Sequence, residues 1–254
     1  GYLHEGHLSL IRQAKAECEH VFVSIFVNPT QFGANEDLSK YPRDLERDLS
    51  LIEPLGVDVV WNPTPEIMYP AGYQTWVEVD ALTHPLEGAI RAGHFKGVTT
   101  VVAKLFNAVQ PHKAYFGQKD AQQAAVIRQM VRDLNFPLEV VVCPIIREAD
   151  GLAMSSRNKY LEGADRIAAV VLSRALSAAK KEYEGGERSA EALRRKMKEV
   201  IEAEPRAQLQ YVSCADYDSL EELEVVKGKT LLSMAVILGK TRLIDNFVLD
   251  KDEK

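Results

Sequence analysis

The chain has few cysteines, no long apolar run and no excess of positive charge. Its cysteines, Cys18, Cys143 and Cys214, are too few and too scattered for a disulfide framework or a zinc site, which predicts a reducing, cytoplasmic compartment. No apolar stretch approaches the roughly 18 residues of a membrane span, and the start has no signal-peptide character, so we expect no membrane partner. The formal charge of −6 argues against a nucleic-acid partner, so an anionic ligand would need a local basic pocket.

Strand-like and helix-like patterns alternate over residues 1–146. Continuous β-branched and aromatic runs such as 21–27 are typical of buried parallel strands, and stretches of helical period separate them. This alternation predicts an α/β fold with a parallel sheet. The predicted helices are 8–18, 43–55, 97–109 and 121–134, and the predicted strands are 21–27, 57–61, 113–116 and 138–143.

The pattern changes after Asn158, where helices come first and strands follow. Two amphipathic helices are predicted at 165–183 and 189–202, and three strands at 209–215, 230–238 and 241–249. We therefore expect a smaller α+β domain over residues 147–254.

The first dozen residues form the most informative stretch, because a turn with Gly6 places His4 and His7 at the mouth of a predicted helix. A helix N-terminus offers unpaired N–H groups and a positive dipole end, which suits phosphate, and imidazoles can add donors. Two histidines at this spacing also occur as metal ligands or as ordinary turn residues. The chain opens on Gly1 inside what looks like a strand-to-helix loop, so we expect that the first strand is missing from this sequence.

Polar residues follow the predicted strands, where ligands bind in parallel sheets. Asn28 and Gln31 offer amides on a loop stiffened by proline, which suits a small polar acid, although Asn-Pro is also plain turn chemistry. Lys119 follows the strand 113–116 and is placed to bind phosphate, beside Asp120, which also suits a helix N-cap.

Two further loops complete the set of candidates. Ser155, Ser156 and Arg157 lie in a glycine-started loop that can wrap phosphates, although such a tripeptide is also common in solvated loops. The stretch 84–94 lacks periodicity, and we expect a flexible loop that acts as a lid or is a plain surface loop.

Several of these motifs carry a family resemblance. The HEGH of 4–7 resembles the HxGH signature of the nucleotidyltransferase superfamily, and the MSSR of 154–157 resembles its KMSKS-type loop. With FVNPTQF at 26–32, YFGQKD at 115–120 and READGLAMSSRN at 147–158, the chain is similar to the pantothenate synthetase family from His4 nearly to its end. Tyr2 departs from the alanine common there, and Gln118 from a frequent glutamate.

This resemblance implies an ATP-dependent ligase that condenses pantoate with β-alanine through a pantoyl adenylate and releases AMP and pyrophosphate. Such chemistry needs positioned anions and no nucleophilic side chain, which fits the absence of a serine–histidine–acid pattern. The family also implies a Rossmann-like domain at 1–146, a C-terminal lid domain at 147–254 and a homodimer through the first domain. ATP enters as a substrate with Mg²⁺, for which no dedicated protein ligands are expected.

The resemblance also implies roles for individual residues. The catalytic set is His4, His7, Lys119, Ser155, Ser156 and Arg157, with His7 as proton donor. The ATP-binding set is Gly1, Tyr2, Leu3, His4, Glu5, Gly6, His7, Gly117, Gln118, Lys119, Asp120, Ile146, Met154, Ser155, Ser156 and Arg157, with Ile146 meeting the adenine through backbone groups. Pantoate and β-alanine are assigned to Gln31, Gln123 and Asn28.

Three other classes of protein fit parts of the pattern. A nucleotidyltransferase acting on a phosphorylated substrate shares the histidine turn, but needs a second phosphate-binding set in place of the amide loop. An aminoacyl-tRNA synthetase needs an RNA-binding surface, which the acidic charge opposes. A non-catalytic nucleotide-binding module would bind ATP and form no AMP.

Overall fold

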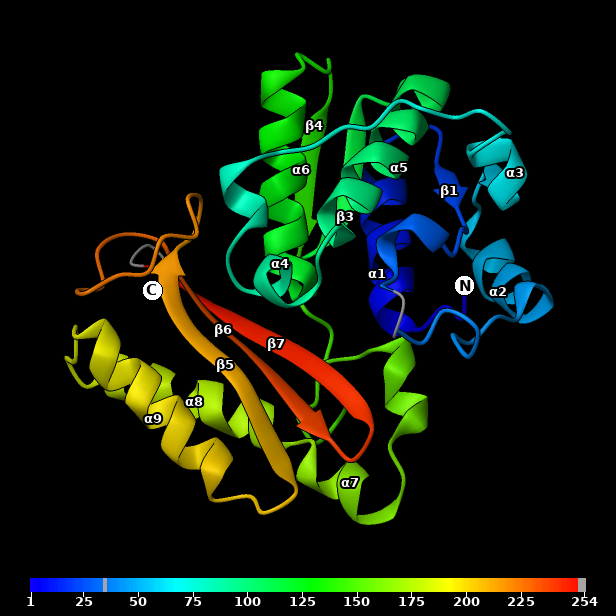
Figure 1. Ribbon diagram of the computed structural model, residues 1–254. Helices are drawn as coiled ribbons and strands as arrows, with labels where there is room; N and C mark the ends of the chain where they lie inside the picture. The colour runs from blue at the N-terminus through cyan, green and yellow to red at the C-terminus, as the bar shows by residue number, and fades with distance from the viewer. Residues whose placement is uncertain (34–35, 251–254) are drawn as a thin grey trace. The chain divides into compact units, whose positions relative to one another are not determined.

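The computed structural model describes residues 1–33 and 36–250, and it divides the chain into two compact units, Gly1–Pro144 and Ile145–Lys254 (Figure 1). Gly1–Pro144 is unit 1, and Ile145–Lys254 is unit 2. Ile146, which we expected at the end of the first domain, lies in unit 2.

Unit 1 alternates helices with short parallel strands, which confirms the α/β prediction. The strand β1 (Phe22–Ser24) pairs with β2 (Val59–Trp61), and β3 (Lys113–Gly117) pairs with β4 (Glu139–Cys143). The helices are α1 (Glu5–Glu17), α2 (Leu45–Ile52), α3 (Pro65–Met68), α4 (Glu87–Ile90), α5 (His94–Val109) and α6 (Ala121–Asp133).

The parallel strands of the described residues pair as two separate two-stranded ladders, where we expected one sheet. The predicted strand 21–27 is cut short because the chain turns into a 3₁₀ helix at Pro29–Gln31. α1 buries Leu8, Ile11 and Ala14 in one apolar cluster with Val21 and Ile25. This cluster anchors the start of α1, where the histidines lie.

Three helix starts and one loop differ from the predictions. α1 begins at Glu5, three residues before the predicted start at residue 8, because His4 caps it. α2 begins at Leu45 because Asp44 caps it, accepting from the backbone N–H of Arg47 at 3.1 Å. α5 begins three residues early, at His94, since Gly93 takes the left-handed conformation (φ 78°) that lets the chain enter the helix there. The stretch 84–94, expected to be an irregular loop, contains α4.

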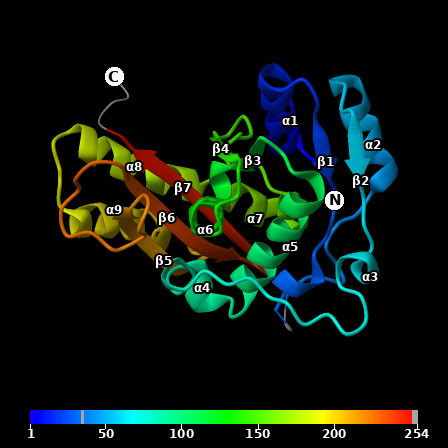
Figure 2. The same ribbon diagram turned by 90° about the horizontal axis from the view of Figure 1, so that it is seen from above.

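Unit 2 is an antiparallel sheet with two helices on one face (Figures 1 and 2). The sheet has the order β5 (Ala207–Asp216), β6 (Thr230–Leu238) and β7 (Thr241–Leu249), and α8 (Val171–Glu184) and α9 (Ala190–Glu202) pack on it. The predicted helix 165–183 is two helices, α7 (Gly163–Ala168) and α8, because bonds of 3₁₀ type interrupt it around Ala169.

The core of unit 2 joins the helices to the sheet. Its fully buried side chains include Leu193, Met197 and Ile201 from α9, and Leu232 and Met234 from β6. No helix within residues 1–33 and 36–250 is both long enough and apolar enough to cross a membrane.

Candidate active site

His4 and His7 cap the N-terminus of α1 in a reciprocal arrangement. Nδ1 of His4 accepts from the backbone N–H of Gly6 at 3.1 Å, and Nδ1 of His7 accepts from the backbone N–H of His4 at 3.2 Å. The ring centroids lie 3.9 Å apart. Because each Nδ1 accepts, each neutral ring carries its proton on Nε2. The turn therefore fixes two Nε2–H donors at the helix end that favours anions.

Both imidazoles are neutral at pH 7. Burial is the largest cause that lowers the pKa of His4 to about 3 and the pKa of His7 to about 4. The positive charge of Lys119 lowers both pKa values further, so Lys119 lies within electrostatic reach of the pair. The histidines are thus neutral hydrogen-bond donors, and the charge of Lys119 acts on both of them.

Asp48 holds the backbone ahead of the histidines, and the sequence analysis missed it. Its fully buried carboxylate accepts from the backbone N–H of Tyr2 at 2.7 Å and from that of Leu3 at 2.6 Å. Arg47 donates to the carbonyl of Leu3 at 2.9 Å. An Arg-Asp pair on an amphipathic helix is typical of a solvated face, so no signal in the sequence singled out Asp48. The path of the turn is set by α2.

Asn28 organises the turn that follows β1. It is only 2% exposed, and its Oδ1 accepts from the hydroxyls of Thr30 at 3.0 Å and Tyr69 at 2.9 Å. Its Nδ2 donates to the backbone carbonyl of Gly97 at 3.1 Å and to Oε1 of Gln31 at 3.3 Å. The amide of Asn28 is therefore engaged inside the protein, while the bond to Oε1 orients the amide of Gln31.

Gly97 lets α5 lie directly against this turn. A Cβ at position 97 would lie 2.4 Å from the carbonyl oxygen of Thr30 and 2.7 Å from the backbone nitrogen of Gln31. Atoms cannot approach so closely, so a side chain there would push the helix and the turn apart. The predicted helix 97–109 starts at Gly97, but nothing in the sequence indicated that this glycine is needed for close packing.

The loop after β3 carries the next predicted group. β3 ends at Gly117, residues Gln118–Asp120 form a 3₁₀ turn, and α6 begins at Ala121. Asp120 occupies the N-cap position of α6 without a capping bond from its side chain. Its negative charge acts on His4, so this loop and the histidine turn lie within electrostatic reach of each other.

Two adjacent glutamines, Gln122 and Gln123, lie in the first turn of α6, and they differ in exposure. Gln122 is 5% exposed, and its Oε1 accepts from the backbone N–H of Glu87 at 2.9 Å. Its Nε2 donates to the carbonyls of Leu82 at 2.9 Å and Pro85 at 2.8 Å. Gln123 is half-buried, and its predicted role in binding pantoate stays a prediction.

In unit 2 the predicted nucleotide-binding residues follow a short hairpin. Arg147 and Ala153 form a bridge, and the backbone N–H of Met154 donates to the carbonyl of Ile146 at 2.9 Å. Arg147 pairs with the buried carboxylate of Asp245 at 2.7 Å, a partner that sequence reasoning did not find. The hairpin is thereby tied to β7.

Ser155 starts the 3₁₀ helix Ser156–Tyr160 as its N-cap, with Oγ accepting from the backbone N–H of Arg157 at 3.2 Å. Ser156 is 5% exposed. The loop is therefore locally ordered.

The candidate residues are divided between the two units. His4, Gln31 and Lys119 belong to unit 1, and the Ser155–Arg157 loop belongs to unit 2. Their convergence stays a prediction.

Within residues 1–33 and 36–250, no group of three histidine, cysteine, aspartate or glutamate side chains could hold a metal ion.

A family model described as pantoate-beta-alanine ligase matches residues 1–248. The chain belongs to this family. The pantothenate synthetase of Roseiflexus castenholzii is 60% identical over 250 residues, which cover 98% of this chain and 90% of that protein. That of Herpetosiphon aurantiacus is 61% identical over 250 residues, with coverage of 98% and 91%.

Solved structures agree with the family assignment. The enzyme of Thermus thermophilus matches with a TM-score of 0.95 and 49% identity, over 97% of this chain and 90% of that one. The Francisella tularensis ligase, complexed with beta-gamma ATP and beta-alanine, matches with a TM-score of 0.77 and 37% identity, over 98% and 86%. The predicted family, fold class and ligase activity are confirmed, while the roles of individual residues stay predictions.

Proposed function

We propose that this chain condenses pantoate with β-alanine to form pantothenate, consuming ATP by way of a pantoyl adenylate and releasing AMP and pyrophosphate. One observation carries the proposal: the capping turn of α1 aims two neutral Nε2–H donors from a helix N-terminus, in a chain that matches the ligase family over residues 1–248. The Francisella relative, which binds an ATP compound and β-alanine, supports the choice of substrates.

In the first step a carboxylate oxygen of pantoate attacks the α-phosphorus of ATP, and pyrophosphate leaves. Negative charge shifts onto phosphate oxygens, where His4, His7 and the ammonium of Lys119 stabilise it. Fixed donors need no reorganisation as the charge develops, and removing one such donor typically costs a factor of about 10²–10³ in rate. Backbone groups of Gly1–Gly6 and Gly117–Asp120 would complete the nucleotide site.

In the second step the amine nitrogen of β-alanine attacks the acyl carbon of the adenylate. The bond from that carbon to the phosphate oxygen breaks, AMP leaves, and the nitrogen gives up a proton. No side chain is covalently modified. The protein holds the two reactants in line and keeps the adenylate in place.

We assign pantoate to Gln31 and Gln123, whose amides can donate to its oxygens. Asn28 has no role in this assignment beyond orienting Gln31, because its own amide is engaged with Gly97 and Tyr69. In unit 2, the phosphates of ATP would be contacted by Ser155, Ser156 and Arg157. The adenine would be contacted by Ile146 and Met154. In this proposal, unit 2 acts as a lid over the nucleotide.

Mg²⁺ would enter with ATP. The described residues hold no group of three side chains that could serve as a metal site, and we take the ion to be held mainly by phosphate and water oxygens. When bound, the ion would supply neutralising charge. The residues named above would position the phosphates that carry it.

The test is pantoate-dependent exchange of labelled pyrophosphate into ATP, with Mg²⁺ present and β-alanine omitted. We expect exchange that requires pantoate, followed by formation of pantothenate and AMP once β-alanine is added. Exchange that proceeds without pantoate, or with phosphorylated acceptors in its place, would point to another nucleotidyltransferase. Binding of ATP without exchange would point to a non-catalytic module.

We also propose a homodimer that works in the cytoplasm. Cys18, Cys143 and Cys214 are free thiols, which suits a reducing compartment. Light scattering at micromolar concentration should give twice the mass of one chain, and a single-chain mass would contradict the dimer.

A further inference from the structure

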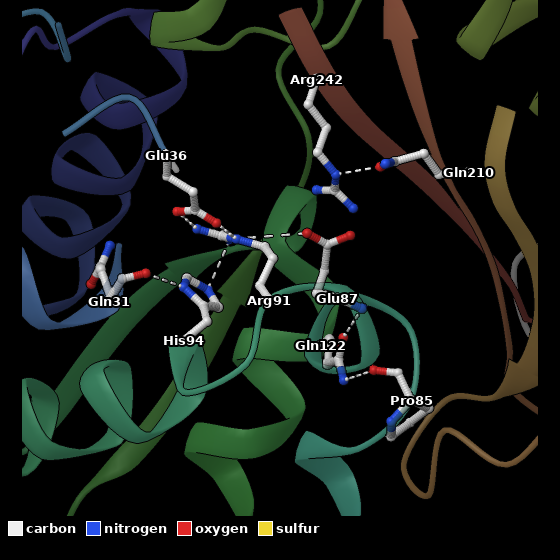
Figure 3. A network of polar contacts seen from close by, with 9 residues as sticks. All are labelled: Gln31, Glu36, Pro85, Glu87, Arg91, His94, Gln122, Gln210 and Arg242. Atoms are coloured by element: carbon white, nitrogen blue, oxygen red, sulfur yellow. Dashed lines mark hydrogen bonds and ion pairs between the residues drawn. The ribbon is translucent and has the colours of Figure 1, made fainter. Parts of the chain in front are cut away.

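His94, at the start of α5, bonds to the turn that carries Gln31 (Figure 3). Its Nδ1 lies 2.8 Å from the backbone carbonyl oxygen of Gln31, and its Nε2 lies 3.1 Å from Nη1 of Arg91. The residue is 8% exposed. The predicted catalytic machinery does not include this histidine.

The two partners determine the tautomer of His94. A carbonyl oxygen can only accept, so Nδ1 must carry a proton and donate it to Gln31. A guanidinium can only donate, so Nε2 must be the acceptor for Arg91. Burial lowers the pKa of His94, and the charge of Arg91 lowers it further, so the neutral Nδ1–H form is kept.

Arg91 is itself held rigidly by carboxylates. Its Nε and Nη2 donate to the two oxygens of Glu36 at 2.6 and 2.8 Å, a bidentate pair, and its Nη1 lies 3.9 Å from Glu87. The Arg91 side chain is 15% exposed. Because a bidentate fork fixes the plane of the guanidinium, Arg91 presents one N–H to His94 in a defined direction.

The segment that carries these residues is fixed from a third side. Gln122 accepts from the backbone N–H of Glu87 and donates to the carbonyl of Pro85, as Figure 3 shows. A Cβ at Gly88 would lie 1.7 Å from the carbonyl oxygen of Thr83, so the backbone around it is close-packed. Residues 84–94, for which we expected either a lid or a plain surface loop, form a brace that is bonded to α6 and to the Gln31 turn.

Gln31 is thus held at two points from different elements. His94 fixes its backbone carbonyl, and Asn28 fixes its side-chain Oε1 at 3.3 Å. With Oε1 turned toward Asn28, the Nε2 group is the part of the amide that can donate to an oxygen of a ligand.

We propose that His94 is a positioning residue for pantoate, which acts by holding the Gln31 turn while Arg91 holds His94 in the Nδ1–H tautomer. The inference rests on the proposed function, because it takes Gln31 to bind pantoate. His94 touches no substrate in this scheme. Its effect is on the affinity for pantoate and leaves the nucleotide site unchanged.

Two substitutions at position 94 separate the bond to Gln31 from the bond to Arg91. In His94→Asn, Nδ2 takes the place of Nδ1 and can still donate to the Gln31 carbonyl. In His94→Gln, the amide reaches the place of Nε2 and the bond to Gln31 is lost. KM for pantoate and for ATP is measured by pyrophosphate exchange, with the melting temperature of each variant as the control for folding.

We expect His94→Gln and His94→Ala to raise the KM for pantoate about tenfold, which equals about 1.4 kcal/mol and is typical of one hydrogen bond. The KM for ATP should not change, and His94→Asn should recover most of the pantoate affinity. Equal effects of Asn and Gln, or parallel rises in both KM values, would overturn the proposal. A role limited to stability would lower the melting temperature without this separation.

Two further measurements keep the inference distinct from the proposed function. Wild-type exchange without any need for pantoate would refute the function itself. If Gln31→Ala raises the KM for pantoate and the His94 variants do not, the proposed function stands and the role of His94 is refuted.

A measurement on the wild type tests the proposal if the His94 variants do not fold. The nitrogen chemical shifts of the imidazole report its tautomer, and an Nε2–H tautomer at His94 would contradict the proposal.

Discussion

The two polar turns of unit 1 are built in opposite ways. In the Gly1–His7 turn, the buried carboxylate of Asp48 holds the backbone, and the histidines cap α1 with Nδ1 while keeping Nε2–H. In the Asn28–Gln31 turn, a residue of the family motif is itself the support, because Asn28 is bonded inside the protein through both its oxygen and its nitrogen.

This difference separates side chains that can meet a ligand from those that hold the turn. A motif residue on a loop can be either, and only its bonding partners distinguish the two cases. In the first turn the supporting residue lies outside the motif, at Asp48. In the second turn the supporting residue, Asn28, belongs to the motif itself, and His94 is a further support. Substitutions that remove either the donor or the support should test this distinction.

The largest effect is expected from His7→Asn. The oxygen of asparagine can take the place of Nδ1 and accept from the backbone N–H of His4, so the cap should survive while the Nε2–H donor is lost. Pyrophosphate exchange should fall by a factor of about 10²–10³. The melting temperature should stay close to that of the wild type, and wild-type exchange in this variant would remove His7 from the chemistry.

Asp48→Ala should cause the largest loss of stability. It leaves the buried N–H group of Leu3 and the partly buried N–H group of Tyr2 without their acceptor, so we expect the free energy of unfolding to fall by about 3 kcal/mol. Urea denaturation measures this. Asp44→Ala is the matched control on the same helix, because loss of an exposed cap should cost about 1 kcal/mol. Equal losses in the two variants would mean that the buried carboxylate has no special role.

Gly97→Ala tests the second turn from the side of α5. The added Cβ cannot fit 2.4 Å from the carbonyl of Thr30, so the turn must move. We expect a loss of about 1–3 kcal/mol in stability and a higher KM for pantoate. Gly33→Ala is the control, because its Cβ would meet Glu36 at an ordinary 3.7 Å. An unchanged KM for pantoate in Gly97→Ala would separate this turn from the pantoate site.

Local patterns predicted much of the fold and the residue types at the site. The strands Thr230–Leu238 and Thr241–Leu249 have the predicted bounds, because their periodicity is clear and a tight turn at Gly239 separates them. The histidine turn at the start of a helix could be predicted because helix entry, glycine and both histidines lie within a few residues, whereas the capping bonds of the two histidines were not predicted.

The supporting residues could not be predicted in this way. Asp48 meets Leu3 across 45 positions, His94 meets Gln31 across 63, and Gln122 meets Glu87 across 35. Each is a polar residue on a helix, where a solvated position is the ordinary expectation. Their burial depends on tertiary packing, which single-sequence periodicity does not contain.

The smallest effect is expected when the pH is varied around neutrality, because neither histidine of the Gly1–His7 turn should titrate there. With pKa values of about 3 for His4 and about 4 for His7, both rings stay neutral and exchange should show no step near the ordinary histidine pKa of about 6.5. A step near that value in the wild type would mean that a charged imidazole acts.

The same two histidines make the stability of the protein depend on pH on the acid side. The unfolded chain takes up protons on them below about pH 6.5, while the folded turn does so only near about pH 3–4. The stability that these rings contribute is therefore full above about 6.5 and is lost as the pH falls toward the folded pKa values. Since His7→Asn removes one of the two rings, its free energy of unfolding should fall less steeply between about pH 6 and pH 4 than that of the wild type.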